Sequence, residues 1–195
     1  MTLNGKKIGF GITASFCTLP DIIEPMELLA AAGADIYPVV SSEVYNNSSR
    51  FHDRDEFLAT IRQIAGREAI ATIAEAEAFG PKNPMDIMII APATGNTIGK
   101  IAHGVWDTPV VMAAKATLRN GAPVLIALFT NDALGISGVN IMQLYNTKNV
   151  YFVPFGQDDP IKKPTSMTAD LGQLEASILQ ALEGKQIQPA LLQKR

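Results

Sequence analysis

Hydroxyl- and amide-bearing residues follow three apolar runs, and they are the residues of this chain best suited to binding a small molecule. The segment Gly11–Ser15 ("GITAS") ends the first run, Ser41 and Ser42 end the second, and Pro92–Thr97 ("PATGNT") ends a third. Small residues at such positions let the backbone N–H groups of a helix start surround an anion, and hydroxyls add further donors. The pattern therefore predicts a phosphate-binding site.

These residues must be positioned by short strands that alternate with helices. We expect strands over six ranges: Lys6–Ile12, Ala34–Val40, Asp86–Ala91, Pro109–Ala114, Pro123–Phe129 and Val150–Phe155. We expect helices over Ile22–Gly33, Asp53–Gly66, the segment that continues Pro92–Thr97, Val139–Tyr145 and Thr168–Leu182, with a loop over Gly156–Ser166. This alternation predicts a single domain spanning residues 1–195, with a Rossmann-like, doubly wound α/β fold whose mostly parallel sheet has helices on both faces. Because ligands of such sheets bind beyond the carboxyl ends of the strands, the three polar segments should meet at one edge.

The same segments have a structural explanation that must be weighed against the functional one. Ser and Thr after a strand are common helix N-caps, and for any one segment alone that explanation is equally good. Three such segments at one sheet edge favour a mononucleotide pocket. A dinucleotide site is disfavoured, because Gly9 and Gly11 are followed by Ala14 rather than a third glycine, and Ser41 stands where an acidic residue would bind a ribose.

Composition excludes several other classes of function. The net charge of −3 gives no reason to expect a nucleic-acid partner, and no apolar run approaches the ~20 residues of a membrane span. Cys17 is the only cysteine, so no intramolecular disulfide can form, which fits a reducing cytoplasm. With two histidines and one cysteine, no metal site is expected.

The stretch Ala91–Asp107 ("APATGNTIGKIAHGVWD") resembles the P-A-S-A-N-T motif and the K-I-A-x-G-x-x-D continuation of the flavoprotein family that binds flavin mononucleotide (FMN). That family includes cysteine-peptide decarboxylases, phosphopantothenoylcysteine decarboxylase and, more distantly, flavin prenyltransferases. The resemblance extends over most of the chain, with "GITAS" similar to the phosphate turn and "PATGNT" similar to the flavin-ring loop. It implies that FMN is bound by Gly11, Thr13, Ala14, Ser15, Ser41, Ser42, Pro92, Ala93, Thr94, Asn96 and Thr97.

Two departures from the family pattern argue against a decarboxylase. The decarboxylases carry a catalytic His about eight residues before the Asp that opens the strand leading into the motif, where this chain has Ala78. Their P-x-M-N-x-x-M-W clamp is replaced by Met112–Asn120 ("MAAKATLRN").

The C-terminal half resembles a narrower group within the family, the dipicolinate synthase B subunits of spore-forming bacteria. The segments that carry this likeness include "TNDALG" (Thr130–Gly135) and "TKNVYFVPFGQDDPIKKPTSM" (Thr147–Met167). The likeness implies oxidation of a (hydroxy)tetrahydrodipicolinate or dihydrodipicolinate intermediate to pyridine-2,6-dicarboxylate during sporulation, in the cytoplasm of the mother cell. It also implies a partner, the A subunit of dipicolinate synthase, that binds NAD(P), and a homo-oligomer that is a trimer or larger. Two alternatives stay open: a flavin prenyltransferase-like enzyme, and a non-catalytic scaffold for the A subunit.

No catalytic residue follows from the sequence, but three side chains are candidates. Asn96 could hydrogen-bond the edge of the flavin ring or a substrate carbonyl, and its alternative role is in the turn itself. Lys115 and Arg119 have i,i+4 spacing on a helix turn expected after the strand Pro109–Ala114, where they could bind a small dicarboxylate. Two solvated surface cations are an equally good explanation. His52 and His103 are expected to be structural.

Overall fold

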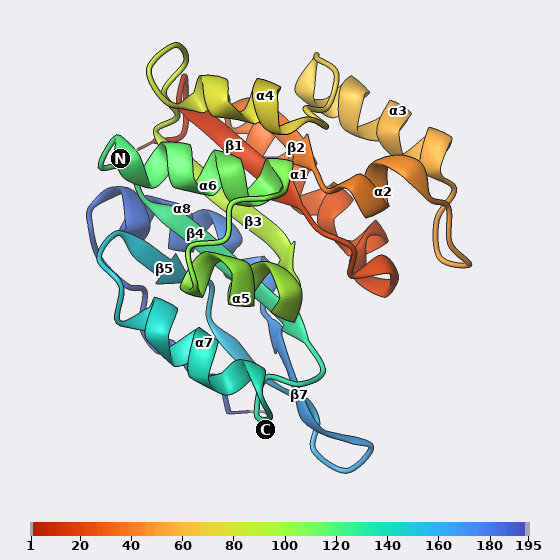
Figure 1. Ribbon diagram of the computed structural model, residues 1–195, viewed down its shortest axis with the longest axis vertical. Helices are drawn as coiled ribbons and strands as arrows, with labels where there is room; N and C mark the ends of the chain where they lie inside the picture. The colour runs from red at the N-terminus through yellow and green to blue at the C-terminus, as the bar shows by residue number, and fades with distance from the viewer. Residues whose placement is uncertain (1, 194–195) are drawn as a thin grey trace.

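A sheet forms the centre of the molecule, and five of its strands run parallel. The structure, a computed structural model, describes residues 2–193. The parallel strands are β1 (Lys7–Ile12), β2 (Asp35–Val40), β3 (Ile87–Ala93), β4 (Val124–Thr130) and β5 (Val150–Phe152), in the spatial order β2-β1-β3-β4-β5 (Figure 1). Every residue of β3 is buried, because the sheet is covered on both faces.

Helices lie on both faces of this sheet, which confirms the predicted Rossmann-like, doubly wound fold. Helix α6 (Pro109–Arg119) packs on one face against β1 to β4, whereas α1 (Ile23–Ala31) and α8 (Leu174–Leu182) lie together on the other (Figure 1). The remaining helices are α2 (Ser42–Asn46), α3 (Arg54–Ala65), α4 (Ile73–Ala76), α5 (Gly95–Ala102) and α7 (Ser137–Tyr145). Short 3₁₀ turns are η1 (Phe16–Thr18), η2 (Pro20–Ile22), η3 (Glu77–Phe79) and η4 (Leu171–Gln173).

Helix α3 illustrates how local signals set an element's limits. Asp53 accepts hydrogen bonds from the backbone N–H groups of Asp55 and Glu56, at 2.9 and 3.1 Å, and so caps the start of the helix. Gly66 ends it with a left-handed φ of 67°, a conformation that costs glycine little. The helix predicted over Asp53–Gly66 is thereby confirmed.

The predicted strand Pro109–Ala114 is wrong, because these residues begin α6. The side chain of Thr108 accepts from the backbone N–H of Val111, and Pro109 occupies the first turn, where its missing N–H costs nothing. Most residues of α6 are buried between the sheet and α4, and its first half, Pro109–Ala114, carries no polar side chain that would mark a helical face. A short apolar run of this kind does not distinguish a buried helix from a buried strand.

The predicted loop Gly156–Ser166 is also wrong, because it forms most of an antiparallel hairpin. Strands β6 (Phe155–Asp159) and β7 (Lys163–Ala169) pair with each other, and β7 pairs with the end of β4 through Phe129↔Thr168. The helix predicted over Thr168–Leu182 accordingly starts later, at Leu174. The hairpin was missed because its strands are half-exposed and polar, without the apolar run that identified the others.

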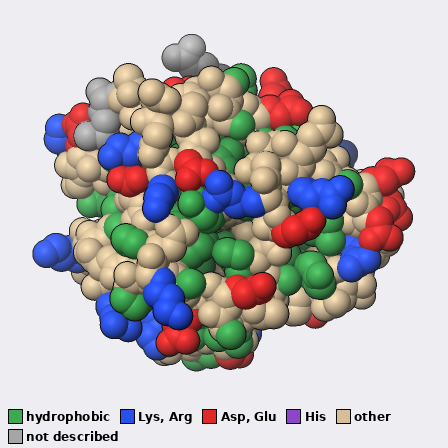
Figure 2. All heavy atoms as spheres, turned by 90° about the horizontal axis from the view of Figure 1, so that it is seen from above, with side chains coloured by type: hydrophobic (Ala, Val, Ile, Leu, Met, Phe, Trp, Pro, Cys, Tyr) green, Lys and Arg blue, Asp and Glu red, His purple; other side chains and the backbone are tan. Residues whose placement is uncertain are grey.

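The surface carries mixed charge. Figure 2 shows Lys and Arg side chains interspersed with Asp and Glu side chains on the face that it presents. No helix among the described residues is long and apolar enough to cross a membrane.

Candidate functional site

The three polar segments singled out in the sequence meet at the carboxyl ends of β1, β2 and β3. Together they surround a cavity of about 180 Å³. This volume is below the roughly 300 Å³ at which pockets begin to enclose a drug-sized ligand, so the cavity suits a phosphate and an attached chain. It is lined by Thr13, Ala14, Ser41, Ser42, Glu43, Thr94, Asn96, Thr97, Lys100 and Thr108.

Thr13 joins the loop after β1 to the loop after β3. Its buried hydroxyl donates to the carbonyl of Pro92 at 2.6 Å and accepts from the backbone N–H of Thr94 at 3.1 Å. The Oγ1 atom of Thr94 lies 3.4 Å from that of Thr13 and 3.2 Å from that of Thr97. These contacts fix the hydroxyls of three threonines at one end of the cavity.

Helix α5 begins at this cavity, and its N-terminus is suited to an anion. Thr94 is the N-cap residue, but its side chain accepts no hydrogen bond from the first turn of the helix. The first N–H groups of a helix have no partner within the helix, and its dipole favours negative charge at that end. The donors of Gly95, Asn96 and Thr97 therefore stand beside the threonine hydroxyls.

Ser41 both lines the cavity and caps the short helix α2. Its side chain accepts from the backbone N–H of Val44 at 3.4 Å. The capping explanation and the binding explanation of this serine therefore hold at once, because its hydroxyl hydrogen remains able to donate.

Asp132 supports the start of α5 from the neighbouring loop. Its carboxylate accepts hydrogen bonds from the hydroxyls of Thr130 and Ser137, the second at 2.8 Å. The bond from Thr130, and then that from Ser137, hold the pKa of Asp132 below its usual range against the opposing effect of burial. A Cβ placed on Gly95 would lie 2.9 to 3.0 Å from oxygens of these three side chains, so only glycine fits over the cluster.

Lys100 lines the cavity but is not among the site residues predicted from the sequence. It lies one turn along α5 from Asn96 and Thr97, and its ammonium pairs with the carboxylate of Asp107 at 2.7 Å. The hydrogen bond from Lys100 lowers the pKa of Asp107. This pair accounts for the Lys and the Asp of the K-I-A-x-G-x-x-D pattern. The helical i,i+3 and i,i+4 spacing of Lys100 from Thr97 and Asn96 is the signal that could have identified it.

Several predicted cofactor residues lie next to the cavity rather than in its lining. Pro92 and Ala93 are buried in β3, where the carbonyl of Pro92 accepts from Thr13, and the Ala91–Pro92 peptide is cis. Gly11 is buried in β1, and the space of its absent Cβ is filled by Met88 and Val110. Ser15 faces a second cavity on the other side of the same loop.

Lys115 and Arg119 do not lie at the carboxyl end of a strand, which corrects their expected placement. Both are exposed in the second half of α6, and neither lines the cavity at the ends of β1 to β3. The expectation failed because it depended on the strand Pro109–Ala114. Asn96, the third candidate, does line the cavity.

The two histidines are placed outside the cavity. His52 packs between the rings of Phe16 and Phe57, each with a centroid distance of 5.4 Å, and its Nδ1 lies 2.8 Å from the hydroxyl of Ser49. His103 is exposed at the end of α5. Within residues 2–193, no three His, Cys, Asp or Glu side chains are grouped so that they could hold a metal ion.

This fold and this cavity define a doubly wound α/β protein with a polar cavity at the carboxyl ends of its strands, an arrangement typical of nucleotide-binding proteins. The chain belongs to the flavoprotein family, whose sequence pattern matches residues 1–181.

Two relatives show which members of the flavoprotein family this chain resembles. It is 48% identical over 192 residues to the B subunit of dipicolinate synthase from Bacillus subtilis (strain 168), covering 98% of this chain and 96% of that one. It is 32% identical over 126 residues to the coenzyme A biosynthesis bifunctional protein CoaBC of Thermococcus kodakarensis, covering 64% of this chain and 30% of that protein.

Solved structures agree with this placement. The crystal structure of the dipicolinate synthase B subunit from Bacillus halodurans C superposes with a TM-score of 0.92 at 46% identity, covering all of both chains. The FMN-dependent cysteine decarboxylase SpaF superposes with a TM-score of 0.67 at 19% identity, covering 92% of this chain and 98% of that one. The second likeness is one of fold alone.

Proposed function

We propose that the cavity at the ends of β1, β2 and β3 holds the phosphate and ribityl chain of FMN. The observation that carries this proposal is the meeting of three polar loops in one cavity, with the start of α5 and Lys100 beside them. Apart from the carboxylate of Glu43, the lining offers hydroxyl and backbone donors with one cation, Lys100, and these match a phosphate and a polyol. The family and the FMN-dependent proteins of the same fold support FMN as the ligand.

Each part of the cavity has a distinct task in this proposal. Thr13, Ala14 and Ser41 bind the phosphate, Lys100 contributes its charge, and the segment Thr94–Thr97 lies against the flavin ring. Asn96 offers its side-chain amide to the ring edge or to the substrate. When bound, FMN supplies a two-electron acceptor, which is the capacity that aromatising a dihydropyridine requires.

The chain as a whole is proposed to act as the B subunit of dipicolinate synthase. Its identity of 48% to the Bacillus subtilis protein extends over nearly the whole of both chains, which supports a shared role. In this role it takes part in oxidising a (hydroxy)tetrahydrodipicolinate or dihydrodipicolinate intermediate to pyridine-2,6-dicarboxylate, together with an A subunit that carries NAD(P). The proposal places the protein in the cytoplasm of the mother cell of a sporulating bacterium. It includes a homo-oligomer, in keeping with a dodecameric protein of the same fold.

Reconstitution tests this role. Purified chain and FMN are mixed with the A subunit and NAD(P)⁺ as the electron acceptor, the dihydrodipicolinate intermediate is added, and formation of pyridine-2,6-dicarboxylate is followed by its ultraviolet absorbance. We expect full turnover only when both proteins are present. Turnover that persists in full without this chain would contradict a catalytic role, and rescue by a variant that does not bind FMN would favour the scaffold alternative.

Replacing Lys100 by glutamine tests the phosphate end of the cavity. A charge-assisted hydrogen bond contributes about 1.5–3 kcal/mol, so the Kd for FMN should rise about 10- to 100-fold in Lys100→Gln, as measured by titration calorimetry. Lys115→Gln is the matched control, because Lys115 is exposed on α6 and does not line the cavity. Equal FMN affinities for the two variants would show that Lys100 does not contact the phosphate.

A further inference from the structure

A second cavity, of about 520 Å³, lies on the other side of the loop that follows β1. Its walls are residues 14–18, the end of β4, the segment Arg50–Phe51 and the β6–β7 hairpin. Ala14 lines both this cavity and the smaller one, so the two adjoin. The volume falls within the range of small-molecule pockets. A ligand here would lie directly beside whatever occupies the cavity at the ends of β1 to β3.

The charged residues of this lining are two cations and one carboxylate. Lys163 and Arg50 are the cations, and Asp158 is the acid. The Lys163 ammonium pairs with Asp158 at 2.8 Å, and the Arg50 guanidinium lies 4.6 Å from the centroid of the Phe51 ring. The hydrogen bond and the charge of Asp158 raise the pKa of Lys163, so its ammonium stays charged at neutral pH. The lining therefore keeps a net positive charge.

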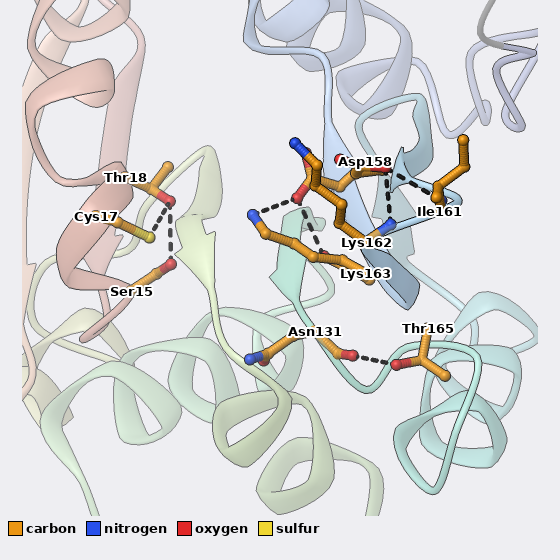
Figure 3. A network of polar contacts seen from close by, with 11 residues as sticks. Ser15, Cys17, Thr18, Asn131, Asp158, Ile161, Lys162, Lys163 and Thr165 are labelled. Atoms are coloured by element: carbon orange, nitrogen blue, oxygen red, sulfur yellow. Dashed lines mark hydrogen bonds and ion pairs between the residues drawn. The ribbon is translucent and has the colours of Figure 1, made fainter.

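Neutral donors complete the lining around these charges. The hydroxyls of Ser15 and Thr18 lie 3.0 Å apart on one wall. Figure 3 shows the Lys163 ammonium and the Asn131 side-chain amide extending from the opposite wall toward Ser15, Cys17 and Thr18. An anion placed between the walls would meet donors from both sides, which is how proteins bind carboxylates.

The hairpin that presents Lys163 is fixed to the rest of the fold. Strand β7 pairs with β4, the hydroxyl of Thr165 donates to the carbonyl of Asn131 at 2.6 Å, and the backbone N–H of Leu134 donates to the carbonyl of Thr165 at 3.0 Å. On the opposite wall, Phe16 stacks on His52 and so holds the segment that carries Arg50. The hairpin thus places Lys163, and the turn that contains His52 places Arg50, in the lining of one cavity.

We propose that this second cavity is the substrate pocket and that Lys163 binds one carboxylate of a small, flat dicarboxylate. The inference deepens the proposed function and rests on it, because it places the substrate beside the flavin cavity. Arg50, on the other rim, is suited to the second carboxylate. Arginine and lysine on facing walls would select a ligand with two separated negative charges over one with a single charge.

Binding of pyridine-2,6-dicarboxylate to the full chain, measured by calorimetry with and without saturating FMN, tests the pocket. We expect Lys163→Met to raise the Kd for the dicarboxylate about 10- to 100-fold and to leave the Kd for FMN unchanged. Lys163→Arg should restore most of the affinity. Lys162→Met is the matched control, because this adjacent exposed lysine does not line the cavity, and it should change neither Kd. Pyridine-2-carboxylate should bind at least tenfold more weakly than the dicarboxylate.

The outcomes separate this inference from the proposed function. A chain that binds FMN but not the dicarboxylate, or equal dicarboxylate affinities for Lys163→Met and Lys162→Met, would overturn the pocket and leave the flavin site standing. A chain that binds the dicarboxylate in a Lys163-dependent way but does not bind FMN would support the pocket and overturn the flavin proposal. Because the Lys163 side chain is 61% exposed, the variant is expected to fold, and its melting temperature checks this.

Discussion

Gly95→Ala is expected to lower the free energy of unfolding by about 1–3 kcal/mol and to raise the Kd for FMN at least tenfold. The added Cβ would lie 2.9 to 3.0 Å from oxygens of Thr130, Ser137 and Asp132, closer than a methyl group can approach. These side chains cannot move apart freely, because both hydroxyls donate to the Asp132 carboxylate. Relief of the overlap must break that cluster or displace the start of α5, and overpacking of this kind costs about 1–3 kcal/mol.

Gly99→Ala is the matched control on the same helix. A Cβ on Gly99 would lie 3.3 Å from the Asn140 side-chain amide, which can rotate away, and alanine favours the helix by about 1 kcal/mol. We therefore expect Gly99→Ala to be neutral or stabilising, with unchanged FMN affinity. Urea denaturation and FMN titration of both variants provide the measurement. Equal stabilities for the two alanine variants would show that the cluster below Gly95 is not packed as described.

Thr13→Val is expected to destabilise the protein by about 2 kcal/mol and to weaken FMN binding at least tenfold. Valine keeps the shape of threonine but removes the acceptor of the Thr94 N–H and the donor to the Pro92 carbonyl. A buried donor left without a partner costs about 1–3 kcal/mol. The loops after β1 and β3 would then lose the link that sets their spacing around the phosphate.

Thr117→Val separates this effect from the general cost of replacing a buried threonine. Thr117 is fully buried, but its hydroxyl donates to the Ala113 carbonyl within its own helix, at 2.9 Å, and lies away from the cavity. Its loss should cost about 1 kcal/mol or less and leave FMN affinity unchanged. If the two valine variants bound FMN equally well, the role assigned to Thr13 would be wrong.

The sequence was sufficient to predict the parallel sheet and the meeting of three polar loops. Buried parallel strands read as continuous apolar runs, and parallel topology brings their carboxyl ends to one edge. Thr13, Ser41 and Thr94 could therefore be selected before their distances were known. Lys100 was overlooked because a lysine on a helix is ordinarily a solvated residue, and only its position one turn from Asn96 and Thr97 distinguishes it.

The C-terminal half was harder to predict because tertiary packing decides its elements. Helix α6 is mostly buried, so its apolar run is as typical of a buried strand as of a buried helix, and Lys115 and Arg119 lie on this helix rather than beyond a strand. The β6–β7 hairpin depends on backbone pairing with the end of β4, for which its polar sequence gives no signal. The sequence therefore predicts a loop at Lys163, whereas the hairpin presents this lysine to the second cavity.

The most direct measurement is a calorimetric titration of the purified full chain with FMN and, separately, with riboflavin. If the cavity at the ends of β1 to β3 binds the phosphate, one FMN should bind per chain, and riboflavin should bind at least tenfold more weakly because it lacks that phosphate. FMN that does not bind, or riboflavin that binds as tightly as FMN, would contradict the account.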